Sequence, residues 1–270
     1  MNLTFIGGGN MATALAGGLA AKGFDARRMK VVEVLPEARQ RLAATLGVAV
    51  FESPAGAAPF GDVVVLAVKP QQMREAARAV APHLSEALVL SIAAGIRLAD
   101  LGRWLGGYAR LARCMPNTPA LIGLGVTGLY ARPEVDAAQR AQAQAVLEAV
   151  GEVIWVDDEA LLDPVTAVSG SGPAYVFHFI EALERAAREV GLDAAAARRL
   201  ALGTVRGAAE LAARSAEPPA TLRERVTSKG GTTERALASL RADGFEALVA
   251  RAVRAANERA RELGLELGKD

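Results

Sequence analysis

A glycine-rich segment close to the start of the chain constrains the fold more than any other feature. The segment FIGGGNMA, residues 5–12, directly follows a short apolar run and opens a helical stretch. Its spacing, Gly7-x-Gly9-x-x-Ala12, permits a tight turn at Gly7, close approach of a phosphate to the backbone at Gly9, and close helix packing at Ala12. With Asn10 and Met11 at the helix start, the segment predicts a loop that binds the pyrophosphate of a dinucleotide. A glycine-rich turn without a ligand is the alternative.

Up to about Asp157, short β-branched runs alternate with helical stretches, a pattern typical of a parallel sheet covered by helices. The run Val63–Val68 is apolar throughout, which indicates a central strand buried on both faces. We predict strands at Leu3–Ile6, Lys30–Val34, Val63–Val68, Ala87–Ile92, Leu111–Met115, Val126–Tyr130 and Val153–Val156. The predicted helices between them include Met11–Lys22, Pro36–Leu46, Gln71–Val80 and Asp136–Val150.

The remainder of the chain is rich in Ala, Arg, Glu and Leu, which are strong helix formers. Pro173 follows Ser171-Gly172 at a predicted helix start, and Asp193 is a predicted N-cap. Thr221-Leu222-Arg223-Glu224 has the spacing of a capping box. We therefore predict two domains, a dinucleotide-binding domain at 1–157 and a helical domain at 158–270.

Composition narrows the class of function. A net charge of +1 provides no field that would gather nucleic acid, so we expect no nucleic-acid partner. The single cysteine, Cys114, cannot form an internal disulfide, and only His83 and His178 are available for histidine chemistry. We interpret all three as structural and expect no metal site.

No apolar run approaches the ~18 residues that span a bilayer. The opening stretch has no Lys or Arg before its apolar part and is interrupted by three glycines, unlike a secretory signal. We expect a cytoplasmic protein without a membrane partner.

Further candidate residues follow the predicted strands. Glu33 ends the second strand, where an acidic residue can accept hydrogen bonds from a ribose; a solvated glutamate is the alternative. Lys69, after the central strand, either meets the cofactor or projects into solvent.

A second glycine-rich segment occurs in the helical half. The residues Ser228-Lys229-Gly230-Gly231-Thr232-Thr233-Glu234 offer backbone N–H groups at a helix start, which suit a small carboxylate. An inter-helix turn explains the same residues.

Six motifs occur in order between about Leu3 and Glu262: FIGGGNMA, LAVKPQ, SIAAGI at 91–96, RCMPNTP at 113–119, SGSGPAYVF at 169–177 and VTSKGGTTERAL at 226–237. In this set the chain resembles the pyrroline-5-carboxylate reductases, which catalyse the last step of proline biosynthesis. The resemblance implies an α/β protein: a Rossmann, doubly wound parallel sheet that carries NAD(P)H, and an all-helical domain that intertwines with a second subunit. A homodimer, or an oligomer of dimers, is expected.

The resemblance also implies roles for single residues. Ala67, Lys69 and Pro70 would contact the cofactor, and Ala93, Ala94 and Asn117 would lie near its nicotinamide. Backbone N–H groups of Gly230, Gly231 and Thr232 would bind the substrate carboxylate with help from Ser228. The Thr233 hydroxyl would lie beside the ring nitrogen, as a catalytic group together with Ser228. Reduction of a cyclic imine needs hydride and a proton but no metal or covalent nucleophile.

One segment departs from the family pattern. Many members have a short polar segment with an Asn or Arg after the second strand, whereas this chain reads Val32-Glu33-Val34-Leu35-Pro36. An acidic residue suits a ribose hydroxyl and repels a 2′-phosphate, so NADH is favoured unless Arg27 or Arg39 reaches the phosphate.

Two alternative functions remain open at this point. A β-hydroxyacid dehydrogenase-like enzyme would need a catalytic lysine, which is missing from Tyr175–Arg188. A non-catalytic nucleotide-binding sensor is the other, and the intact Thr233 argues against it.

Overall fold

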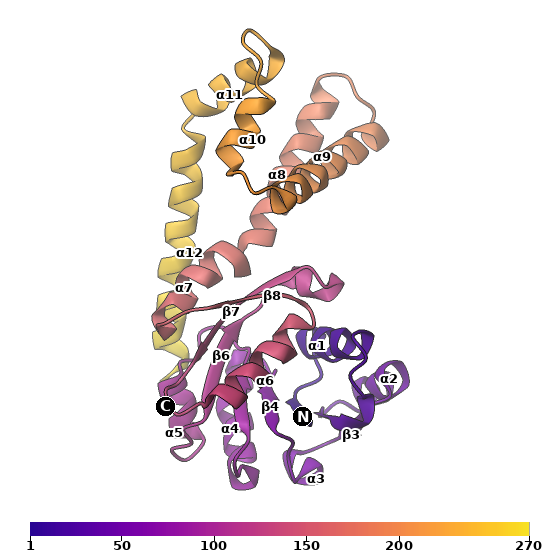
Figure 1. Cartoon of the computed structure of the whole chain (residues 1–270), viewed down its shortest axis with the longest axis vertical. Helices are drawn as coiled ribbons and strands as arrows, with labels where there is room; N and C mark the ends of the chain where they lie inside the picture. Colours follow the sequence, from indigo (N-terminus) through magenta and orange to yellow (C-terminus); the bar gives the residue numbers. More distant parts are fainter. Residues whose placement is uncertain (270) are drawn as a thin grey trace. The chain divides into compact units, whose positions relative to one another are not determined.

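The structure is a computed structural model that describes residues 1–269. One part of the chain forms an eight-stranded sheet with the strand order β3-β2-β1-β4-β5-β6-β7-β8 (Figure 1). The strands are β1 (Leu3–Ile6), β2 (Met29–Val32), β3 (Ala49–Phe51), β4 (Val63–Leu66), β5 (Leu88–Ser91), β6 (Leu111–Met115), β7 (Gly125–Ala131) and β8 (Gly151–Trp155). All seven predicted strands are present, with ends shifted by a few residues.

Strand direction corrects part of the prediction. The strands β1 to β6 are parallel, but β7 runs antiparallel to β6, and β8 is parallel to β7. The sheet is therefore only mostly parallel. The prediction missed β3, because a three-residue strand at the sheet edge leaves almost no hydrophobic pattern. The strand order reverses between β1 and β4, and such a switch point is where doubly wound sheets bind ligands.

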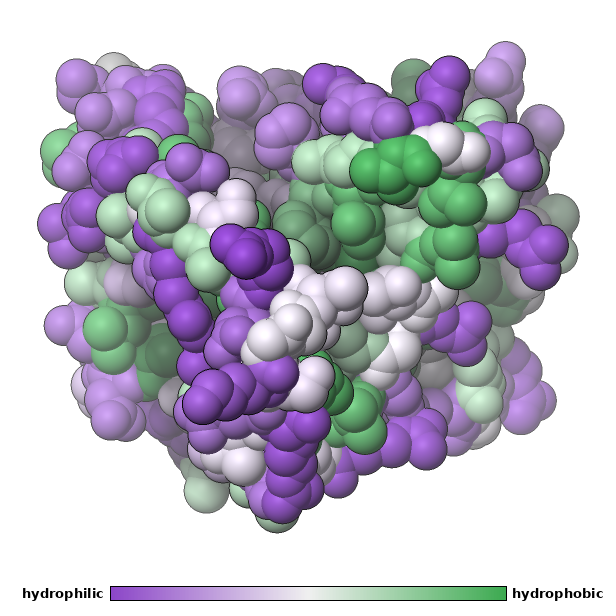
Figure 2. Space-filling view, turned by 90° about the horizontal axis from the view of Figure 1, so that it is seen from above, coloured by the Kyte–Doolittle hydropathy of each residue, from purple (hydrophilic) through white to green (hydrophobic). Residues whose placement is uncertain are grey.

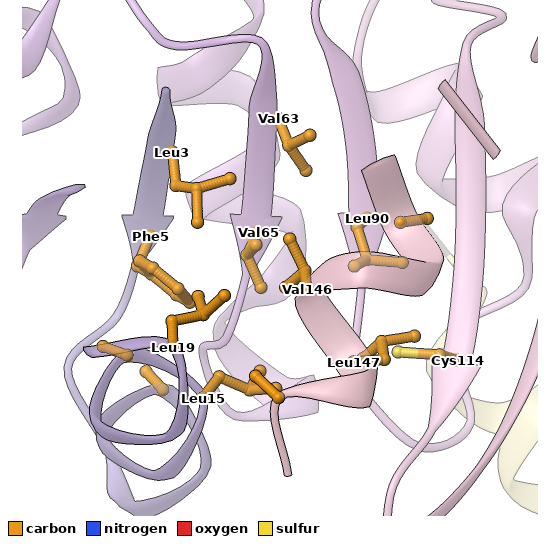
Figure 3. Packing of buried hydrophobic residues seen from close by; sticks show 14 of the residues in the cluster. Leu3, Phe5, Leu15, Leu19, Val63, Val65, Leu90, Cys114, Val146 and Leu147 are labelled. Carbon is orange, nitrogen blue, oxygen red and sulfur yellow. The ribbon is translucent and has the colours of Figure 1, made fainter. Parts of the chain in front are cut away.

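Helices cover both faces of the sheet. On one face, α1 (Asn10–Ala21), α2 (Pro36–Leu46) and α6 (Ala137–Glu148) share a core with the strands. Figure 3 shows this packing: Leu15 and Leu19 of α1 and Val146 and Leu147 of α6 point toward side chains of β1, β4, β5 and β6. The opposite face is covered by α3 (Pro54–Ala57), α4 (Met73–Val80) and α5 (Leu98–Trp104).

Short helical turns complete the connections. Within the described residues, five are 3₁₀ turns, at Ala26–Arg28, Pro70–Gln72, Ala81–His83, Thr118–Ile122 and Glu159–Leu161. After Glu159–Leu161 the chain continues through α7 (Leu162–Val165) into a π-helix, Thr166–Gly170.

The chain divides into two compact units. The sheet unit comprises Met1–Ser171 together with the C-terminal residues from Ala255 onward, and the helical unit comprises Gly172–Arg254. The sheet unit extends beyond Asp157, where the sequence placed the end of the first domain, because residues 159–163 form ion pairs with Arg113 and Arg97. The helix α12 (Phe245–Leu267) belongs to both units.

The helical unit contains α8 (Gly172–Glu189), α9 (Ala194–Arg214), α10 (Pro219–Arg225), α11 (Thr232–Ala242) and the first part of α12. Asp193 caps α9 as predicted, since its carboxylate accepts a hydrogen bond from the Ala196 amide. The capping box at Thr221 is wrong: α10 begins at Pro219, because proline at a first helical position needs no N–H donor there. Within residues 1–269, no helix combines the length and apolarity needed to cross a membrane.

Candidate active site

The glycine-rich loop lies at the switch point between β1 and β4. Gly7 has φ +101°, and its amide donates to the Val32 carbonyl at 2.8 Å. A Cβ atom on Gly7 would lie 2.8 Å from the carbonyl oxygen of Ala67, which follows β4. Both the left-handed backbone and this close approach require glycine. The loops after β1 and β4, which carry the predicted cofactor residues, are therefore in direct contact.

The N-terminus of α1 is suited to an anion. Gly9 is its exposed N-cap, and Asn10 and Met11 form the first helical positions. Among the described residues, no side chain caps the start of α1, and its first turn contains no acidic residue. The space beside Gly9 is open, since a Cβ atom there would meet no atom within 4 Å. Uncapped amides and the helix dipole favour a bound anion. This cradle fits the pyrophosphate of a dinucleotide.

The carboxylate of Glu33 connects two loops of this site. Its Oε2 accepts a hydrogen bond from the Gly8 amide at 2.9 Å, and its Oε1 accepts one from the Leu35 amide at 2.9 Å. Each carboxylate oxygen has a second lone pair that a ribose hydroxyl could use. Glu33 is half-buried, and its role toward a ribose stays a prediction.

The two arginines considered for a 2′-phosphate differ in their surroundings. The Nη1 of Arg39 donates to the carbonyl oxygens of Glu33, at 2.6 Å, and Val34, at 2.9 Å. Arg27 is held by the exposed carboxylate of Asp25, which raises the pKa of the Arg27 guanidinium. Only Arg39 is therefore withdrawn from solvent: 88% of the Arg27 side chain is exposed, and Arg27 precedes β2, at the opposite edge of the sheet from the glycine-rich loop.

The remaining predicted cofactor residues follow the next three strands. Lys69 and Pro70 come after β4, Ala93 and Ala94 after β5, and Asn117 after β6. Since β4, β5 and β6 are parallel, these residues share the carboxyl edge of the sheet with the glycine-rich loop. Lys69 is exposed and Ala93 is buried.

Sequence reasoning missed a cluster of buried charges close to this edge. Arg113 of β6 pairs with Glu159 at 3.0 Å, and Arg97 pairs with Asp163. Only 3% of the Arg113 side chain is exposed; burial lowers its pKa, and Glu159 opposes that shift. An arginine in the apolar strand Leu111–Met115 was the available signal, since a buried cation must be paired. The cluster fastens residues 159–163 to the sheet.

The single cysteine and the two histidines lie in different surroundings. Cys114 is buried in the core, where burial raises the pKa of its thiol and makes it unreactive. His83 packs edge-on against Phe60, with ring centroids 5.9 Å apart. His178 is exposed on α8, near Glu181. In the described part of the chain, no three His, Cys, Asp or Glu side chains are grouped so as to hold a metal ion.

In the helical unit, the predicted substrate loop connects α10 to α11. The Gly230 amide donates to Oε2 of Glu234 at 2.7 Å, and the Gly231 amide donates to the Ser228 carbonyl at 3.0 Å. Thr232 and Thr233 begin α11, with Thr232 exposed and Thr233 half-buried. Two of the three amides assigned to the substrate carboxylate thus have partners within the loop, and their assignment stays a prediction.

Comparison with known proteins matches both halves of the chain. Residues 159–263 match the family described as pyrroline-5-carboxylate reductase dimerisation. Residues 2–95 match the family described as NADP oxidoreductase coenzyme F420-dependent. The pyrroline-5-carboxylate reductase of Pseudomonas aeruginosa is 50% identical over 268 residues, which cover 99% of this chain and 98% of that protein. The chain belongs to the pyrroline-5-carboxylate reductase family.

Solved structures of this family have the same fold. A pyrroline-5-carboxylate reductase from Coxiella burnetii matches with a TM-score of 0.93 and 41% identity, over 97% of this chain and 98% of that one. Plasmodium falciparum pyrroline carboxylate reductase with NADP bound matches with a TM-score of 0.86 and 29% identity, over 98% of each chain. Membership of this family confirms the predicted fold class and decides against the β-hydroxyacid dehydrogenase alternative.

Proposed function

We propose that this protein reduces 1-pyrroline-5-carboxylate to L-proline with a nicotinamide cofactor. The observation that carries the proposal is the Gly7 loop packed against Ala67 at the switch point, in a chain with full-length relatives named for this activity. The uncapped start of α1 suits the cofactor's pyrophosphate, and Glu33 suits a ribose hydroxyl. When bound, the cofactor supplies the hydride.

The chain's own residues orient the substrate and handle the proton. Ser228 and the amides that open α11 are proposed to bind the substrate carboxylate, because helix N-terminal amides favour anions. The Thr233 hydroxyl is proposed to hydrogen-bond the ring nitrogen, where it can hold or pass a proton as the carbon is reduced. Catalysis would then be mainly orientation of a protonated imine, which is already a good hydride acceptor.

Within this function, we propose that NADH is used at least as well as NADPH. The Glu33 carboxylate would face a 2′-phosphate, and Arg39 is bonded to two carbonyl oxygens. Val34 and Leu35 are exposed apolar residues that offer no side-chain donor. A missing charge-assisted contact costs about 1.5–3 kcal/mol, or roughly tenfold or more in preference.

Assays of the purified full-length protein test both levels of this proposal. Consumption of NADH or NADPH with 1-pyrroline-5-carboxylate, together with release of proline, is expected; a folded protein that consumes neither cofactor would favour the sensor alternative. The kcat/KM ratio of the two cofactors tests the preference. Glu33→Gln should shift that ratio toward NADPH, whereas Glu37→Gln, an exposed control on α2, should not. A clear NADPH preference in the unmodified protein would show that Arg39 or another cation reaches the phosphate.

The match to a dimerisation family supports homo-oligomerisation. We further propose that the assembly is a dimer or a multiple of dimers, that the active site is complete only in the assembly, and that the protein is cytoplasmic. Exposed apolar side chains on α8, including Val176, Phe177 and Phe179, support a helical subunit interface. The single buried cysteine suits a reducing compartment.

A further inference from the structure

Asn117 follows β6 at the carboxyl edge of the sheet, and its side-chain amide is held at both ends. Its Oδ1 accepts a hydrogen bond from the Val126 amide at 2.9 Å, and its Nδ2 donates to the Ser169 hydroxyl at 3.1 Å. These two partners fix which end of the amide is oxygen and which is nitrogen. The Asn117 amide is therefore fixed in orientation at the edge where a doubly wound sheet binds its ligand.

Ser169 belongs to the π-helix Thr166–Gly170 and is the first residue of the SGSGPAYVF motif. The proposed chemistry assigns no role to this motif. The Ser171 amide donates to the Thr166 carbonyl at 2.8 Å, and this wide turn presents the Ser169 hydroxyl toward Asn117 and the Val126 carbonyl, 3.4 Å away. A Cβ on Gly170 would lie 2.7 Å from Cε of Met115, so the turn packs closely on β6. Single π-turns occur frequently at functional sites.

The base of this segment is fastened by the buried charges. Glu159 pairs with Arg113 and also accepts a hydrogen bond from the Leu98 amide at 2.8 Å. Asp163, which is buried, pairs with Arg97, four residues after the predicted nicotinamide residue Ala93. Residues 159–170 are thus fixed at one end by ion pairs to Arg113 of β6 and to Arg97 in the loop after β5, and at the other end by Ser169 to Asn117 in the loop after β6.

We propose that Ser169 is a positioning residue for the reaction and acts through Asn117. By taking one Nδ2 hydrogen, Ser169 fixes the amide so that its second N–H, which no described residue accepts, donates to a ligand at the sheet edge. This inference rests on the proposed function, because the ligand is the cofactor of that reaction. A purely structural role, in which Ser169 only ties β7 to the π-helix, is the competing explanation.

A double-mutant cycle on the full-length protein separates the two explanations. Ser169→Ala and Asn117→Ala should each lower kcat/KM for the preferred cofactor by about 5- to 50-fold, because a small misplacement of an orienting group is costly. The double variant should be no worse than Asn117→Ala alone, since Ser169 then has no amide to position. Ser171→Ala, which removes a hydroxyl at the end of the same π-helix, is the matched control and should retain normal kinetics.

Cofactor affinity and melting temperature separate a positioning role of Ser169 from a structural one. Cofactor dissociation constants, measured by fluorescence without substrate, should rise for Ser169→Ala and for Asn117→Ala, should rise no further in the double variant, and should be unchanged for Ser171→Ala. Multiplicative losses in the double variant, or a Ser169→Ala protein with lower melting temperature but unchanged kinetics and binding, would overturn the proposal. If the unmodified protein fails to reduce the imine, the proposed function fails, yet the binding cycle still decides whether Ser169 acts through Asn117.

Discussion

The two units of this chain bury their side chains in opposite ways. In the sheet unit, Phe5, Leu66 and Ile96 are essentially inaccessible to solvent, and cores lie on both faces of the sheet. Among the described residues of the helical unit, only Ala197 and Ala201 are buried. Its larger apolar residues are exposed instead, as in Phe177 at 61% and Leu211 at 60%. Figure 2 shows exposed apolar surface (green) between hydrophilic side chains.

This contrast shows that the sheet unit buries its apolar side chains within itself, whereas the helical unit does not. Helices with exposed apolar residues need another surface, because helical stability in proteins comes mainly from packing an amphipathic face. Large apolar side chains exposed on one unit indicate an association surface. The units also differ in buried charge: the sheet unit contains the buried Arg113, paired with Glu159, whereas the Arg214–Glu210 pair of the helical unit lies at the surface.

The largest expected effect comes from charging the exposed apolar face of the helical unit. Phe177→Glu should dissociate the assembly and lower kcat/KM by at least about 100-fold, since burying an unpaired carboxylate costs several kcal/mol. Sedimentation velocity and steady-state kinetics measure the two effects. Arg185→Glu, on a polar position of the same helix, is the control and should leave both nearly unchanged. A monomeric Phe177→Glu protein with full activity would separate catalysis from assembly.

The structure changes how this comparison should be tested by truncation. From the sequence alone, a chain ending near Asp157 is predicted to remain soluble and to bind NADH. Such a chain would leave Arg113 without Glu159 and Arg97 without Asp163, and it would also lose the segment from Ala255 that belongs to the sheet unit. Full-length variants are therefore the sharper test.

The next effect concerns the buried charges of the sheet unit. Glu159→Ala should destabilise the protein by about 3–5 kcal/mol, because it leaves the buried Arg113 guanidinium unpaired and removes an acceptor from the Leu98 amide. Urea unfolding measures this change. Glu152→Ala, at an exposed position of β8, is the control. A loss below about 1 kcal/mol would mean that water reaches Arg113.

The sequence predicted the parts of this structure that depend on local pattern. The Val63–Val68 run identified the central strand, and the glycine spacing predicted the tight turn at Gly7 between a strand and a helix, because both signals are local. The antiparallel direction of β7 escaped prediction, since it depends on how the chain returns from β6 and not on which residues are apolar. The attachment of residues 159–163 to the sheet unit escaped prediction for the same reason: Glu159 and Asp163 are ordinary acidic residues until their partners are known.

The site residues likewise divide into those predicted from a local pattern and those that depend on contacts between distant segments. Gly9 and Glu33 could be proposed from a strand-turn-helix pattern, whereas the bond of Asn117 to Ser169 joins residues far apart in the sequence. The partners of Gly230 and Gly231 are local, but which of several nearby acceptors a loop amide chooses is not encoded in residue spacing. Contacts between distant segments are what the sequence pattern left undetermined.

A smaller and more specific effect tests the chemistry assigned to the helical unit. Thr233→Ala should lower kcat by about 10- to 1,000-fold with little change in melting temperature or cofactor binding, if its hydroxyl serves the ring nitrogen in the transition state. Ser228→Ala is the contrasting variant and should act mainly on KM, since a substrate carboxylate is present throughout the reaction. If Thr233→Ala is unimpaired, Tyr175 becomes the next candidate.

The smallest expected effect returns to the exposed charges of the helical unit. The guanidinium of Arg214 pairs with Glu210 at 2.6 Å one helical turn away, and 79% of the Arg214 side chain is exposed. Solvent screening and side-chain entropy leave such pairs a contribution of about 0.3–0.5 kcal/mol. Arg214→Ala should therefore change the free energy of unfolding by less than about 0.5 kcal/mol, measured in urea beside Glu159→Ala. A loss above about 1 kcal/mol would indicate that a second subunit removes this pair from water. In that case assembly would bury charged side chains of the helical unit as well as its apolar ones.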